Sequence, residues 1–153
     1  MPAPPELAAF MIEMSIDGAP ALVLVLSADG AVNRGGSGKA GPVEKDVFIE
    51  QTDGTFFREV VTAFDPSWLD KAGIYALPGR VGPRHILKLS LLCIGRPPVV
   101  LAFDYRLDSG PPPAIQAFIQ RALEVTQPWY DRQRQAVARF DASAQKKPWW
   151  KLW

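Results

Sequence analysis

The chain has 153 residues and a mass of 16.8 kDa, which suits one domain with its own hydrophobic core. Hydrophobic residues make up 48% and charged residues 22%, proportions that exclude a disordered chain and a collagen-like fibre. With 17 basic and 16 acidic side chains the formal net charge is +1, so the whole chain lacks a basic field for nucleic acid. The single cysteine, Cys93, excludes an internal disulfide. Neither a secretory signal nor an apolar run of ~20 residues is evident, so we expect a cytoplasmic protein.

The N-terminal third has the pattern of a β-meander. Apolar and polar side chains alternate over residues 10–17, which predicts a half-buried strand, and Asp17-Gly18 is a turn signal. Residues 21–27 are apolar at both parities, a pattern typical of a strand that is covered on both faces. Two shorter strands are expected, over residues 31–34 and 47–51.

Two helices are predicted before the middle of the chain. Phe57, Val60 and Phe64 lie on one helical stripe, and Asp53 is a candidate N-cap for that helix. Asp65 precedes a proline, which is the usual opening of a helix and predicts a second, short helix.

The second half of the chain contains the longest predicted elements. Strands over residues 84–94 and 99–107 are joined by a Gly-Arg-Pro-Pro turn, so we expect an antiparallel hairpin. The spacing of apolar residues predicts a helix over 113–126, which Pro128 should kink or restart. Strands and helices are segregated along the chain.

These elements predict an α+β fold with a single domain over residues 9–140. Its core is expected to be a mainly antiparallel sheet of about five strands, packed against the C-terminal helices. Residues 141–153 are interpreted as a polar linker followed by a Trp/Lys-rich tail.

Motifs for catalysis are weak. His85 is the only histidine, and it lies eight residues from Cys93 on one predicted strand, about 26 Å away. We therefore expect no nucleophile-base dyad between them, unless a bulge or a second chain brings the two together. Too few nitrogen and sulfur ligands are present for a zinc site. The Gly-rich segment 33–42 departs from the phosphate-binding loop, because Asn33 replaces its first glycine and Ala40 replaces its Ser or Thr.

Two carboxylate pairs are candidate acid–base or Mg²⁺ sites: Asp65 with Asp70, and Asp104 with Asp108. Asp65 is explained as a helix cap and Asp108 as a turn residue. We therefore expect no catalytic residues, no cofactor and no metal, and an enzyme with a carboxylate- or Arg-based site is kept only as a third interpretation.

The C-terminal tail is the strongest anomaly. Four of the five tryptophans follow residue 127. From Pro128 onward the chain has six basic residues and only two acidic ones. This end therefore carries +4 and the rest of the chain −3. Disordered ends usually lack aromatic residues, so the cluster needs an explanation.

Four explanations remain open for the tail. Its tryptophans could cap the core of this domain, dock a partner protein, sit at a membrane interface, or stack on single-stranded nucleic acid, which the balanced charge makes unlikely. Our leading hypothesis is a small, non-catalytic, cytosolic binding protein of the adaptor, chaperone or inhibitor (immunity) type, and the alternative is a peripheral membrane protein anchored by the tail. Two arginines of a Pro/Gly-punctuated loop add a second candidate contact, since Arg recognises carboxylates. The candidate partner-binding residues are Trp149, Trp150, Lys151, Trp153, Arg80 and Arg84.

Overall fold

The computed structural model of the chain describes residues 6–36, 47–75, 85–104 and 112–146. Its centre is a seven-stranded sheet in the order β4-β3-β2-β1-β6-β7-β5. Every neighbouring pair is antiparallel except β5 with β7. The strands are β1 (Leu7–Ile16), β2 (Ala19–Ser27), β3 (Ala31–Gly35), β4 (Val47–Gln51), β5 (Gly73–Tyr75), β6 (His85–Cys93) and β7 (Val99–Asp104).

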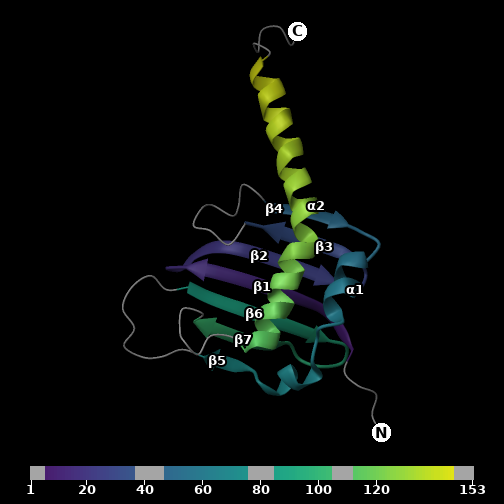
Figure 1. Cartoon of the computed structure of the whole chain (residues 1–153), viewed down its shortest axis with the longest axis vertical. Helices are drawn as coiled ribbons and strands as arrows, with labels where there is room; N and C mark the ends of the chain where they lie inside the picture. The colour runs from purple at the N-terminus through teal and green to yellow at the C-terminus, as the bar shows by residue number, and fades with distance from the viewer. Residues whose placement is uncertain (1–5, 37–46, 76–84, 105–111, 147–153) are drawn as a thin grey trace.

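Helices cover one face of this sheet. The helix α1 (Thr55–Val61), the 3-10 helix η2 (Pro66–Asp70) and the long helix α2 (Pro113–Lys146) complete the fold. In Figure 1, α1 and α2 lie on the same side of the sheet, and α2 runs across the strands and projects past β4. The α+β class and the mainly antiparallel sheet are confirmed.

Local turn chemistry sets the register of the meander. Asp17 and Gly18, between β1 and β2, both have positive φ, 51° and 82°, as the tight hairpin turn requires. The resulting register pairs Glu13 with Val23 on β2 and with Lys88 on β6. The predicted β6–β7 hairpin also forms.

The core lies between the sheet and α2. Phe10 of β1 meets Phe118 of α2 at a ring-centroid distance of 4.9 Å, and Phe118 meets Trp68 of η2 at 5.4 Å, both edge-on. The apolar stripe that predicted this helix is buried on the sheet, and it consists of Ile115, Phe118, Ile119 and Ala122.

Pro128 interrupts neither the helix nor its contact with the sheet. It is exposed, and so is Glu124 one turn earlier, whose carbonyl loses its usual N–H partner. Because that carbonyl lies on the exposed side of the helix, water can satisfy it. The chain therefore forms one helix of 34 residues, about 51 Å long.

Several expectations need correction. The sheet has seven strands rather than about five: the predicted strand over 47–51 joins it as the edge strand β4, and β5, which was not predicted, forms the other edge. The N-cap of α1 is Gly54 rather than Asp53, whose carboxylate instead accepts hydrogen bonds from the backbone and hydroxyl of Thr55. The polar segment expected to be a linker is helical as far as Lys146.

Candidate functional site

The structure places none of the predicted partner-binding residues. Arg80 and Arg84 lie in the range 76–84, and the four tail residues lie in 147–153, all outside the described residues. Trp129, the first of the four C-terminal tryptophans, is buried against the sheet, and its indole N–H donates to Glu50 of β4. That tryptophan therefore belongs to the core, and only the last three remain as candidate anchors.

His85 and Cys93 are held apart, and Asp65 has a structural role. Of the second carboxylate pair, Asp108 lies outside the described residues. His85 and Cys93 are the two end residues of β6, so about 26 Å of extended strand separates them. Burial raises the pKa of the Cys93 thiol, which makes it a poor nucleophile. The Asp65 carboxylate accepts a hydrogen bond from the Ser67 amide at 2.9 Å, and this bond lowers its pKa.

Among residues 6–36, 47–75, 85–104 and 112–146, no three His, Cys, Asp or Glu side chains come together as a metal site. The Gly-rich segment 33–42, considered for phosphate binding, begins in the last residues of β3. Its residues from 37 onward are not described.

A buried arginine that the sequence analysis did not single out fastens α2 to the sheet. Arg34 of β3 is 1% exposed and donates to three acceptors on α2. These are the Leu123 carbonyl at 3.1 Å, the Thr126 hydroxyl at 2.9 Å and the Gln127 amide oxygen at 2.6 Å. Its guanidinium also lies 4.6 Å from the ring centroid of Tyr130.

No carboxylate accepts directly from Arg34 in these bonds. The Gln127 amide instead links Arg34 to a carboxylate, because it accepts from Arg34 and donates to Asp131 at 2.9 Å. Burial lowers the pKa of Arg34, while Tyr130 and Asp131 act in the opposite direction. A cation closed in beneath a helix cannot reach a substrate, so we assign Arg34 a structural role.

The sheet face that points away from α2, here called the open face, is the first candidate interaction surface. Its residues alternate with the core residues along each strand. No helix covers this face in the part of the chain that the structure describes (Figure 1). Its apolar residues are Met11, Val23, Val25, Val47, Ile49, Ile74, Ile86, Leu92, Val100 and Ala102.

The exposure of this face is unusual for a solvated sheet. Antiparallel sheets that face water normally carry polar residues outward. Here Ile74 is 84% exposed, Ile49 74% and Val100 40%. Ile49 and Ile74 lie on the two edge strands, and Glu13, Lys88 and Ser90 stand between them, so the apolar side chains are spread over the face. A large exposed apolar surface is a feature of interaction sites.

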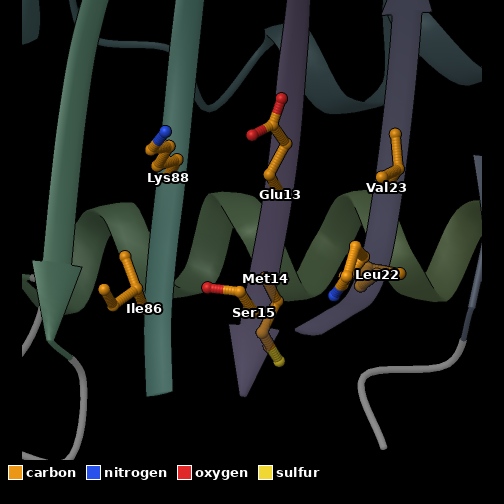
Figure 2. A pocket seen from close by; sticks show the side chains of 8 residues that line it. Glu13, Met14, Ser15, Leu22, Val23, Ile86 and Lys88 are labelled. Atoms are coloured by element: carbon orange, nitrogen blue, oxygen red, sulfur yellow. The ribbon is translucent and has the colours of Figure 1, made fainter. Parts of the chain in front are cut away.

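A shallow hollow of about 350 Å³ lies at the centre of the sheet toward one end of its strands. Figure 2 shows Glu13 and Lys88 side by side on neighbouring strands there, with Val23 beyond Glu13 and α2 behind the sheet. Its lining also includes Met14, Ser15, Pro20, Leu22 and Ile86. One acidic and one basic side chain over apolar walls can orient a partner.

The second candidate surface is the projecting part of α2, here called the arm and defined as Asp131–Lys146. Burial on the sheet ends at Tyr130, and every residue from Arg134 to Arg139 is exposed. At 1.5 Å per residue the arm extends about 24 Å beyond the sheet-packed part of α2.

No helix among the described residues is both long enough and apolar enough to cross a bilayer. Comparison with protein-family models, with curated proteins and with solved structures gives no match.

Proposed function

We propose that this protein is a non-catalytic binding protein that engages a protein partner through the C-terminal end of α2 and the Trp-rich segment that follows it. The observation that carries the proposal is the arm, which leaves the sheet and is exposed over Arg134–Arg139. The arm places Lys146, its last described residue, about 24 Å beyond the sheet-packed part of α2.

The physics of the arm supports a partner. Because Arg134–Arg139 are exposed, packing against the sheet does not stabilise this part of the helix, and contacts with another molecule would. Its described side chains include the arginines Arg132, Arg134 and Arg139, against the single acid Asp131. The partner is therefore expected to be acidic where it meets the arm.

The tryptophans would supply the affinity. Each docked Trp buries about 150–250 Å², and Trp is enriched among residues that dominate binding energy. Replacing one such anchor by alanine costs about 2 kcal/mol, or roughly a 30-fold loss of affinity.

The test compares the full chain with a chain in which residues 148–153 are replaced by Gly and Ser at equal length. A partner is captured from lysate, purified and titrated against both chains, and thermal unfolding of both is measured. A second variant with Trp149, Trp150 and Trp153 changed to Phe keeps aromatic area and should retain part of the affinity.

The proposal requires binding to fall at least about 30-fold while the unfolding midpoint stays unchanged. Unchanged binding with a sharply lowered midpoint would show that the tryptophans cap the core. The membrane alternative is tested with vesicles of phosphatidylcholine alone and with added phosphatidylserine. Tail-dependent binding to the anionic vesicles, with no protein partner, would replace the adaptor proposal by the membrane one.

A further inference from the structure

The proposed role of the arm does not explain the apolar residues of the open face. Strand β2 is apolar at both parities, the pattern of a strand buried on both faces, yet helices cover only one face among the described residues. Its residues Val23 and Val25 point to the other side. A second layer is therefore expected on the open face, and the fold must obtain it from elsewhere.

The hydrogen-bonded register arranges this face in rows across the sheet. One row reads, from β4 to β5, Val47, Gly35, Val23, Glu13, Lys88, Ala102 and Ile74. The next reads Ile49, Asn33, Val25, Met11, Ser90 and Val100. The only ion-pair candidates in these rows, Glu13 and Lys88, stand on adjacent strands at their middle (Figure 2).

These rows are complementary to themselves. A two-fold axis that runs along the strands, midway between β1 and β6, would lay a second copy of the sheet face to face on the first. It would place Glu13 over Lys88 of the other copy, and Lys88 over its Glu13. Opposite charges would thus meet twice at the centre of the interface.

The same operation matches the flanking residues. Val23 would lie over Ala102 of the other copy and Val25 over its Val100, so apolar side chains meet. Ile74, which is 84% exposed, would lie over Gly35, which has no side chain but is itself buried in the single chain. The strands of the two copies would run nearly aligned, which is the common arrangement of packed sheets.

The overlap of the two copies sets the size of the interface. Six strands overlap, since β4 has no strand opposite it; at about 4.8 Å spacing they are about 29 Å wide, and six residues at about 3.3 Å are about 20 Å long. The projected area is therefore on the order of 600 Å², below the ~800 Å² per partner of a standard stable interface. We infer that the protein forms a two-fold symmetric homodimer through the open face, with Glu13 and Lys88 setting its register.

The experiment measures the mass of the full chain by light scattering after gel filtration and by sedimentation over a range of concentrations. A dimer of twice 16.8 kDa is expected. Lys88→Glu should weaken dimerisation by on the order of 100-fold, because the two-fold axis creates two like-charge contacts. The double variant Glu13→Lys with Lys88→Glu restores both contacts and should restore the dimer.

A matched pair of valines tests the location. Val100 on the open face and Val137 on the arm are 40% and 42% exposed. Val100→Lys should give a monomer and Val137→Lys should leave the dimer intact, and circular dichroism with thermal unfolding confirms that each variant is folded. A folded monomer for the unmodified chain at every concentration would overturn the inference.

Two further results would also overturn it: a dimer that survives Val100→Lys but not Val137→Lys, or a charge swap that fails to restore it. The chain with residues 148–153 replaced should remain dimeric. Loss of partner binding and loss of the dimer are therefore separate outcomes, so either proposal can fail alone.

Discussion

Removal of the Arg34 guanidinium should loosen α2 from the sheet. The informative variants are Arg34→Met, which keeps the apolar stem, and Arg34→Ala, which also leaves a cavity. Arg34 donates three hydrogen bonds to α2, and bonds from a charged donor contribute about 1.5–3 kcal/mol each. Burial of the cation costs several kcal/mol, so only part of this sum stabilises the fold.

The net loss of unfolding free energy depends on whether the acceptors of Arg34 find other partners once the guanidinium is removed. The Thr126 hydroxyl still donates to the Ala122 carbonyl at 2.8 Å, and the Gln127 side chain is only partly buried and can turn to water. We therefore expect Arg34→Met to cost about 1–2 kcal/mol. Arg34→Ala adds the loss of packing around the stem, for a total of about 3–4 kcal/mol.

Thermal unfolding followed by circular dichroism measures both variants, with urea titration for the free energy. At about 2–4 °C per kcal/mol for a chain of this size, Arg34→Ala should lower the midpoint by roughly 10 °C. Arg58 is the matched control, since it is exposed and also donates two hydrogen bonds, to the Asp53 carbonyl and the Thr55 hydroxyl. Arg58→Ala should cost less than about 1 kcal/mol. A more stable Arg34→Met variant, or equal losses at Arg34 and Arg58, would refute this reasoning.

Two further predictions concern local backbone chemistry. Gly30→Ala should be strongly destabilising, because Gly30 has a φ of +99° and a Cβ there would lie 2.0 Å from the Thr52 carbonyl oxygen. Gly95 has a φ of +76° but open space around it, so Gly95→Ala should cost only about 1 kcal/mol of backbone strain. Equal unfolding midpoints for the two variants would contradict this. The pKa of Asp65 is lowered by its hydrogen bond from Ser67, so its contribution to stability is present above the ordinary Asp pKa of 3.8 and is lost as the pH falls through the lower folded value. The stability advantage of the unmodified chain over Asp65→Ala should therefore be constant near neutral pH and shrink in acid, and a gap that widens in acid would exclude the cap as its source.

The sequence determined the elements whose information is local. Alternating parity located β1, two long apolar runs located the β6–β7 hairpin, and helical spacing located the first half of α2. Asp17-Gly18 determined the first turn and Asp65 the cap of η2, because both depend on residues next to each other in the chain. The Trp-rich end was visible as composition alone, and its role stays a prediction.

Only the tertiary structure decided the features that depend on distant residues. β5 has three residues and forms by pairing in parallel with β7, which no local pattern announces. In the sequence Arg34 falls at the start of a Gly-rich segment. Its burial depends on acceptors on α2 that are about 90 residues away along the chain. The open face was hidden for the same reason: β2 signals burial on both sides, but a pattern of side chains cannot say which layer covers each side, since that depends on where the helices cross the sheet.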